Sequence, residues 1–255
     1  MTVELGRLVS HLNQYLEVGN FNEPAINGLQ VAGAKKVHKV AFAVDGVLET
    51  FEKAIEWGAD LLIVHHGIYW GFQYALRGPD YKRIKTLMDH DLALYAAHLP
   101  LDAHPEVGHN VNLLRALGVD DSSLEPFGNY KGMSIGFQGR VEDTTREAMA
   151  DKLSEVLRGP VQLLGFGPDK IRKVACVTGA GADFNLVREA KINGIHFYIS
   201  GEAAHPIYHF AQENGVNLAL GGHYRTETFG LVALSKYLAA KYDLETIFID
   251  CPTEM

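Results

Sequence analysis

The chain has 255 residues, 47% of them apolar and 21% charged, which is enough for one large or two ordinary domains with a sizeable core. Its formal net charge of −8 argues against nucleic acids and anionic membrane surfaces as partners. No apolar run reaches the roughly 18 residues of a membrane-spanning helix. Cys176 and Cys251 lack metal-ligand spacing, so we expect reduced core thiols and a cytoplasmic location.

The predicted elements alternate along the chain. An amphipathic helix is expected at the N-terminus, where leucines recur at helical spacing from Leu5 to Leu16. Thr144 and Glu147 form a capping box that is expected to begin a later helix. The predicted strands are 40–44, 61–64, 92–96, 134–137, 174–177, 197–199, 218–220 and 246–249. Strands that alternate with helices indicate an α/β fold, with mixed or parallel sheets flanked by helices.

The two halves of the chain repeat one pattern. Residues 37–67 and 171–202 both read as strand, helix and strand, with a glycine at the same helix end. The next strand of each half ends in a histidine, His98 or His223, and an acid follows four residues later, Asp102 or Glu227. Two aligned strands that end in the same pair of residues indicate an internal duplication.

The histidines of the first half point to a metal site. His65 and His66 follow a buried strand, at the edge of an α/β sheet where ligands bind. Adjacent side chains of a strand face opposite ways, so both can serve one site only if the chain turns at Gly67. The alternative is that one histidine is a ligand and the other makes a local hydrogen bond.

The second half adds a further histidine and the carboxylates. His223 and Glu227 lie four residues apart and share a helix face, and Asp102 can bridge two ions. Nitrogen and carboxylate ligands suit zinc, manganese, iron, cobalt or nickel better than magnesium or calcium. We therefore expect two divalent ions per subunit, with coordination positions left open for water. The predicted ligands are His65, His66, Asp102, His223 and Glu227.

Other residues receive supporting roles. We expect His98 to orient Asp102 or to move a proton, with direct metal ligation as the alternative. Glu202 is expected to share the catalytic proton transfer, whereas His205 and His209 either line the cleft or belong to a solvated helix face. The loop 67–80 carries aromatic side chains that could stack a heterocycle, although packing or subunit contact is the better explanation for them: Tyr69, Trp70, Phe72 and Tyr74.

Common catalytic motifs are absent from the sequence, which has no HExxH, GxSxG or GxxxxGK[ST]. The glycine-rich segment that begins at Thr178 has Phe184 where a dinucleotide-binding motif needs its third glycine. We interpret that segment as a tight turn.

Five segments together resemble one family. They are NGLQV (27–31), DLLIVHHG (60–67), AHLPLD (97–102), SGE (200–202) and GHYRTETFG (222–230). The family is that of the Nif-three-like dinuclear metal-centre proteins, also called GTP cyclohydrolase I type 2 homologues. Relatives usually read HHP where this chain has Gly67, which is expected to loosen the turn without removing a ligand.

The resemblance implies two interlinked α/β lobes, a metal site between them and a ring-shaped homohexamer. It implies the same five metal ligands as the residue pattern does. We expect the first lobe at 1–128, completed by 215–255, and the second at 129–214.

Two functions are compatible with these observations. The first is a metal-dependent hydrolase of the GTP cyclohydrolase type, acting on a nucleotide or a similar small heterocycle. The second is an oligomeric metal-binding or scaffold protein without turnover. The sequence selects neither the metal nor the substrate.

Overall fold

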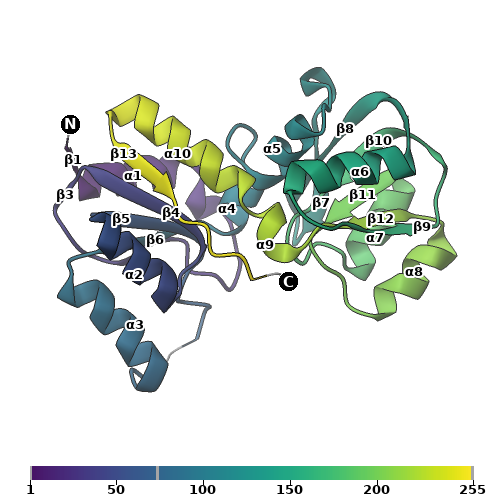
Figure 1. The fold of residues 1–255 in the computed structure, drawn as a ribbon. Helices are drawn as coiled ribbons and strands as arrows, with labels where there is room; N and C mark the ends of the chain where they lie inside the picture. The colour runs from purple at the N-terminus through teal and green to yellow at the C-terminus, as the bar shows by residue number, and fades with distance from the viewer. Residues whose placement is uncertain (1, 73–74, 254–255) are drawn as a thin grey trace. The chain divides into compact units, whose positions relative to one another are not determined.

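The computed structural model describes residues 2–72 and 75–253, and the chain divides into two compact units (Figure 1). Unit 1 consists of residues 1–101 and 230–251, and unit 2 of residues 102–229 and 252–255. The chain therefore leaves unit 1, builds unit 2, and returns to unit 1 for its C-terminal helix and strand.

Unit 1 is built on a five-stranded sheet in the order β13-β4-β5-β6-β2. Neighbouring strands are parallel from β13 to β6, whereas β2 runs antiparallel to β6. Its strands are β1 Val3–Glu4, β2 Gly28–Val31, β3 Lys36–Val37, β4 Lys39–Asp45, β5 Leu61–His66, β6 Ala93–Ala96 and β13 Glu245–Phe248. Its helices are α1 Leu5–Tyr15, η1 Val18–Asn20, α2 Leu48–Trp57, α3 Gly78–Asp89 and α10 Phe229–Tyr242, and α4 Leu99–Asp102 spans the boundary to unit 2.

Helices cover both faces of the unit 1 sheet (Figure 1). Along β4, Ala41 and Ala43 pack with Phe51 of α2 and Leu87 of α3 in one cluster. Strand side chains alternate between faces, so the other buried residues of β4 lie on the side of α1 and α10. Strands buried on both faces explain the continuous apolar runs of the sequence.

Unit 2 contains a six-stranded sheet in the order β7-β8-β10-β11-β12-β9. Strands β10, β11 and β12 are parallel, and β8 and β9 flank them in antiparallel orientation. Its strands are β7 Glu125–Tyr130, β8 Met133–Thr145, β9 Gln162–Gly165, β10 Lys170–Cys176, β11 Phe197–Ser200 and β12 Asn217–Leu220. Its helices are α5 His109–Ala116, η2 Asp121–Ser123, α6 Arg146–Leu157, α7 Phe184–Ile192, α8 Pro206–Asn214 and α9 His223–Thr226.

The unit boundaries differ from the expected 128/129 and 214/215. Helix α5 packs on the unit 2 sheet through Leu113 and Leu114, in one cluster with α6. Strand β12, which we expected to complete the first lobe, pairs with β11 and β9 of unit 2. Hydrogen-bonded pairing and shared burial, which no local pattern encodes, decide these boundaries.

The duplication is visible in the connectivity of the two units. The path α1-β2-β4-α2-β5-α3-β6-α4 in unit 1 corresponds to α6-β9-β10-α7-β11-α8-β12-α9 in unit 2. In both, three parallel strands are followed at one edge by an antiparallel strand, β2 or β9. The predicted α/β class with two related, interlinked lobes is confirmed, because each half donates its last elements to the other unit.

One local prediction is wrong by a single residue. Helix α6 is capped by Thr145, whose hydroxyl accepts a hydrogen bond from the backbone N–H of Ala148. Thr144 and Thr145 both belong to β8, paired with Ile171 and Lys170, and the helix begins only at Arg146. The strand therefore runs one residue further than predicted, and the cap is Thr145 instead of Thr144.

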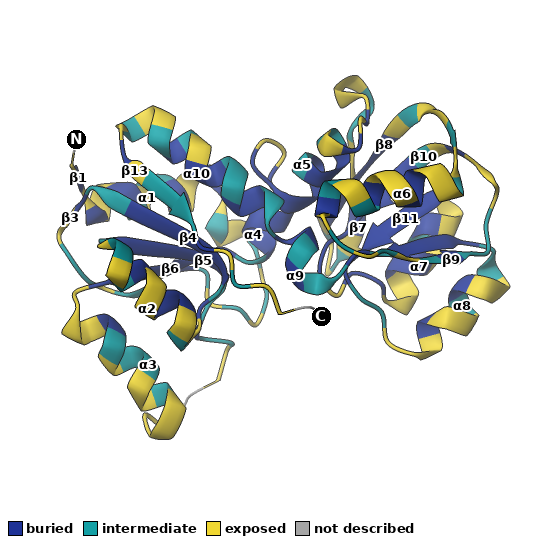
Figure 2. Cartoon of the chain, viewed as in Figure 1, coloured by how far each residue is buried: buried dark blue, intermediate teal, exposed yellow. Residues whose placement is uncertain are grey.

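The burial pattern follows the layers (Figure 2). The central strands are buried along most of their length, whereas longer helices such as α2, α3 and α6 alternate between buried and exposed residues. Across residues 2–72 and 75–253, no helix combines the length and the apolarity that crossing a bilayer requires.

Candidate metal centre

Strand β5 ends in the two histidines that the sequence singled out. Backbone pairing continues to the end of the strand, because His66 is the partner of Asp45 on β4. The rings of His65 and His66 nevertheless lie 4.7 Å apart between centroids. The two neighbouring rings therefore lie close together at the end of β5, and the chain leaves the strand at Gly67.

His98 joins them. Its ring centroid lies 4.9 Å from that of His65 and 5.6 Å from that of His66. The three imidazoles can offer ligand atoms that lie within 4.8 Å of one another, close enough for one cation. Unit 1 thus contains a cluster of three imidazoles, which we call the histidine trio.

Each ring of the histidine trio is held in the same way. The Nδ1 atom lies 2.9 Å from the carbonyl oxygen of Ala97 in His65 and 2.8 Å from Oδ1 of Asp45 in His66. In His98, Nδ1 faces Oε2 of Glu23. An Nδ1 atom that faces an oxygen acceptor carries the hydrogen in the neutral ring, so Nε2 bears the lone pair. Metal-binding histidines are oriented by contacts of this kind.

The Glu23 carboxylate belongs to a buried clamp around His98. Its side chain is only 2% exposed. Besides facing His98, it accepts hydrogen bonds from the backbone N–H of Leu99 and from the amide of Asn27. Asn27 in turn accepts from the backbone N–H of His98. Our sequence analysis missed Glu23, because its irregular segment has neither periodicity nor a metal-binding motif.

Gln30 holds the turn after His66. Its side-chain oxygen accepts a hydrogen bond of 2.7 Å from the backbone N–H of Ile68. A Cβ atom at Gly67 would lie 2.3 Å from the Gln30 amide nitrogen, so a side chain there would displace the Gln30 amide from this position. The turn that we expected glycine to loosen is therefore held by a second strand, β2.

Trp70 forms an aromatic wall beside the histidine trio. Its ring lies edge-on to His98, with centroids 5.1 Å apart, and 6.0 Å from His66. The indole N–H donates to the carbonyl oxygen of Gly67, which fixes the ring. Of the other predicted loop aromatics, Phe72 is exposed, and Tyr74 lies outside the described residues.

In unit 2, His223 lies between two carboxylates. Its Nδ1 is 2.9 Å from Oε1 of Glu202, and its Nε2 is 3.2 Å from Oε2 of Glu227. Burial lowers the pKa of His223, but hydrogen bonds and charge from Glu227 and Glu202 outweigh it and raise the pKa to about 9. His223 is therefore protonated at neutral pH, and a metal ion would have to displace that proton.

A second acidic group of unit 2 surrounds Asp102. The carboxylate is buried, accepts a hydrogen bond from the Thr178 hydroxyl, and has a ligand atom within 4.8 Å of one on His109. Asn110 ties these segments together, because its side chain donates to the carbonyl oxygen of Asp102 and accepts from the backbone N–H of Thr178. Our sequence analysis assigned no role to His109, which begins α5 and is fully buried.

Gly179, in the glycine-rich segment after β10, lies against the side chains of Glu227 and His223. A Cβ atom there would lie 2.0 Å from Oε1 of Glu227 and 3.0 Å from Nε2 of His223. The backbone N–H of Gly179 also donates to the Thr226 hydroxyl. The segment that we predicted to be only a tight turn therefore makes room for the proposed metal ligands. The expected tight turn is present, since Gly179 has a φ of +60°.

The donor set suits a divalent transition metal. Imidazole nitrogen and carboxylate oxygen are ligands that zinc, manganese, iron, cobalt and nickel accept. Asp102 and Glu227, 6% and 3% exposed, are buried carboxylates that gain stability from nearby positive charge. In this structure the protonated His223 supplies such charge to Glu227. The residues present therefore fit a metal centre, although the ions' number and identity do not follow from the donors.

Comparison with known proteins agrees with the motifs. The profile of the Duf34/NIF3 (NGG1p interacting factor 3) family matches residues 3–254. The chain belongs to this family. A relative from Archaeoglobus fulgidus, named GTP cyclohydrolase 1 type 2 homolog, is 43% identical over 254 residues, covering 99% of this chain and 100% of its own. A Halobacterium salinarum relative of the same name is 44% identical over 256 residues, covering 98% and 99%. The resemblance inferred from the sequence is thus confirmed.

Solved structures of the family share the fold. A Thermus thermophilus protein, TTHA1606, superposes with a TM-score of 0.90 at 35% identity, covering 99% of this chain and 100% of its own. The protein ybgI, described as of unknown function, gives a TM-score of 0.92 at 32% identity, with the same coverage. The similarity to these two structures therefore covers both units of this chain.

The remaining candidates lie apart from these groups. His205, which precedes α8, and His209 on α8 are exposed, with ring centroids 6.2 Å apart. Cys176 is a buried free thiol, and its burial, with a smaller contribution from Asp102, raises its pKa well above the ordinary range. Cys251 is also a free thiol, is partly buried beside Lys53, and packs against the edge of the unit 1 core.

Proposed function

We propose that this chain is a metal-dependent hydrolase that binds two divalent ions per subunit. The proposed ligands are His65, His66, Asp102, His223 and Glu227. The observation that carries the proposal is the shared orientation of the imidazoles: in His65, His66 and His223, Nδ1 faces an oxygen acceptor. This arrangement presents Nε2 to a cation and is typical of metal-binding histidines.

The chemistry follows from the ligand types. Bound divalent ions supply Lewis acidity and lower the pKa of water toward neutrality. Asp102 and Glu227 supply negative charge that offsets two adjacent cations, and each carboxylate has two oxygens for this purpose. Glu202, to which we first gave a share of the proton transfer, is proposed to orient His223 because it faces Nδ1 of that ring.

His98 is proposed to move the proton. Its Nδ1 faces the buried Glu23 carboxylate, and a carboxylate in that position stabilises the protonated ring. The alternative from the sequence, that His98 is a third metal ligand in unit 1, makes a different prediction. In the variant Glu23→Gln, a proton-transfer role leaves metal content unchanged and shifts the pH profile of activity, whereas a ligand role lowers metal content.

A substrate screen tests the hydrolase. Protein loaded separately with zinc, manganese, iron, cobalt or nickel is incubated with GTP, phosphoesters and cyclic amides. We expect turnover with at least one metal, and none with Glu227→Gln in the same metal. The names of the curated relatives make GTP the first compound to test. Metal binding without turnover would reject the hydrolase and favour a metal-binding or scaffold protein.

We further propose a ring-shaped homohexamer in the cytoplasm. The support is family membership together with the exposed apolar side chains around the loop 67–80, such as Phe72, Leu76 and Tyr81. Light scattering is expected to give about six times the 28.1 kDa chain mass. A monomer at micromolar concentration would contradict this assembly.

A further inference from the structure

One face of the unit 2 sheet is left partly uncovered at its edge. Strand β9 is the last strand of the sheet, and Gln162 pairs with Leu220 of β12. Because strand side chains alternate, Gln162 and Leu164 share a face, and Leu163 packs with the cluster on the opposite face. The shared face borders a hollow of about 340 Å³, which we call the β9–α8 hollow.

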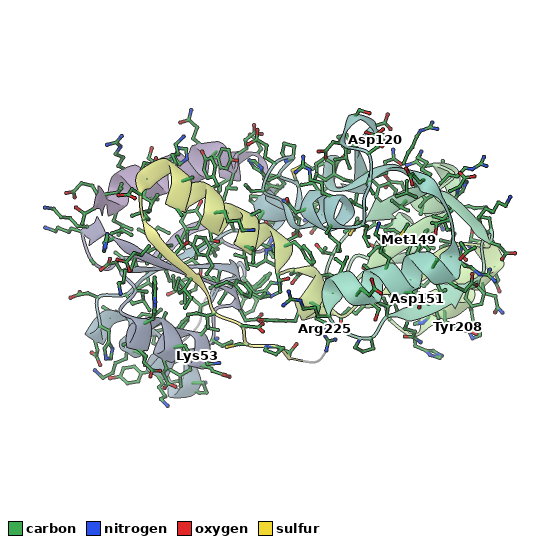
Figure 3. The ribbon with its side chains drawn as sticks, turned by 45° about the horizontal axis from the view of Figure 1, so that its top comes forward. Lys53, Asp120, Met149, Asp151, Tyr208 and Arg225 are labelled. Atoms are coloured by element: carbon green, nitrogen blue, oxygen red, sulfur yellow. The ribbon has the colours of Figure 1, made fainter. Side chains whose placement is uncertain are left out.

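Helix α8 supplies an aromatic wall to the β9–α8 hollow. Tyr208 is 41% exposed (Figure 3), yet its ring is fixed edge-to-face against Phe166, with centroids 5.2 Å apart. His209 is likewise perpendicular to Tyr208 at 5.2 Å, and His205 is perpendicular to His209. A tyrosine held on two sides loses little conformational entropy when another ring packs against it.

The lining has the composition of a site for a neutral flat ring. Leu164 and Leu220 are apolar, and the Gln162 amide can both donate and accept at the polar edge of a heterocycle. Among the described lining residues there is no lysine, arginine, aspartate or glutamate, so the site has no permanently charged side chain to hold a phosphate. The volume lies in the range of small-molecule sites, about 300–1,000 Å³.

We propose that the β9–α8 hollow binds a purine-like heterocycle. Its lining is continuous along the chain with the residues around His223. Ala203, part of the lining, directly follows Glu202, and Leu220 comes three residues before His223. Both segments leave the carboxyl ends of parallel strands, where α/β sheets bind ligands. The inference rests on the proposed function, because the bound ring would be the part of the substrate that the enzyme recognises.

The test uses the full chain freed of metal by a chelator. Guanosine is titrated while saturation-transfer NMR reports which ligand protons contact the protein, and calorimetry gives the dissociation constant. We expect stronger transfer to the base protons than to the ribose protons. Tyr208→Ala should weaken binding about tenfold, because one base–aromatic contact is lost.

Two further variants keep the test decisive. Gln162→Met retains the size of an exposed side chain but removes the amide, and should also weaken guanosine binding. Met88→Ala removes an exposed apolar side chain of unit 1 and should leave binding unchanged. Absence of saturation transfer at millimolar guanosine, or equal losses in all three variants, would overturn the proposal.

Metal content separates this inference from the proposed function. All three variants should bind as much metal as the wild type, measured by plasma mass spectrometry, because none changes a proposed ligand. If the chain binds guanosine but never binds metal, the metal-dependent hydrolase is rejected and the heterocycle site in the β9–α8 hollow is retained. Normal metal content without guanosine binding would reject the hollow alone.

Discussion

The two units share one chain path but differ in the chemical groups at the ends of their strands. Unit 1 presents the histidine trio after β5 and β6, and its nearby carboxylates, Asp45 and Glu23, face Nδ1 atoms. Unit 2 presents the buried carboxylates Asp102 and Glu227 together with His223. The duplication has therefore produced an imidazole-rich set in one unit and a set with two buried carboxylates in the other.

The difference assigns separate tasks to the two units. Neutral imidazoles can select a transition metal but cannot offset its charge. Buried carboxylates can offset the charge, but they are costly to keep buried without a nearby cation. The protonated His223 takes part of that role for Glu227, so a metal ion bound by these residues would have to compete with that proton.

The largest effect is expected from the carboxylates of unit 2. Glu227→Gln keeps the side-chain size and removes the negative charge, so two adjacent cations would repel each other with less compensation. Plasma mass spectrometry after gel filtration should give about two ions per wild-type chain, as a two-metal site requires, and about one or fewer in the variant. Glu213→Gln, an exposed substitution on α8, is the matched control and should behave as the wild type.

Asp102→Asn identifies which carboxylate matters more. Glu227 follows His223 by one helical turn, and its carboxylate is 3.2 Å from that ring, so both can reach one ion. Asp102 has a shorter side chain. If Asp102→Asn loses the ions and Glu227→Gln retains both, the bridging role belongs to Asp102.

A smaller effect is expected from the carboxylates that face Nδ1. Asp45→Asn in unit 1 and Glu202→Gln in unit 2 are matched changes, each at a carboxylate that faces a proposed ligand. Loss of such a contact typically weakens metal affinity about 10–100-fold. Asp45→Asn should have the larger effect, because its side chain is 27% exposed against 45% for Glu202.

Competition with a chromophoric chelator measures both affinities. Wild-type affinity in both variants would mean that these carboxylates do not orient the rings. A larger loss in Glu202→Gln would reverse the proposed ranking by burial.

Backbone strain next to the carboxylates should cost less still. Gly179 and Gly194 have similar positive φ angles, +60° and +63°, but only Gly179 has Glu227 in the path of a Cβ atom. Alanine at either position should lower the free energy of unfolding by about 1–3 kcal/mol through strain alone. Gly179→Ala should lose more, and its metal content should fall while that of Gly194→Ala does not.

Urea unfolding of the metal-free variants gives the comparison. If the two variants are equally destabilised and both keep their metal, the close approach of Glu227 to Gly179 contributes nothing to the free energy of unfolding or to metal binding.

The mildest expected effect is a pH dependence of the metal-free protein. The pKa of His223 is about 9 in the folded chain, above its ordinary value of 6.5. Its contribution to stability is therefore complete below pH 6.5 and is lost as the pH rises through about 9. Thermal midpoints measured in chelator should fall across this window more steeply for the wild type than for His223→Gln. Parallel curves would contradict the pairing of His223 with Glu227.

Much of the architecture was predictable because it follows from local pattern. Every predicted strand has a counterpart, and the helix that ends at Gly58 does so in the left-handed conformation that glycine favours. Short edge strands such as β2 and β9 were missed, because four residues at a sheet edge carry little alternation. The cap was predicted at Thr144 instead of Thr145 for a different reason: β8 continues to Thr145 by pairing with Lys170, which lies 25 residues away.

The sequence by itself determined the α/β class, the duplication and the five proposed ligands, because apolar periodicity and repeated His-x-x-x-acid spacing are local properties. Only the tertiary structure decided how these groups are held. Glu23, Asn27, Gln30 and Gly179 reach the candidate ligands from segments that are distant in sequence and carry no motif. Their roles depend on which strands become neighbours, and strand pairing is set by the burial of whole sheet faces.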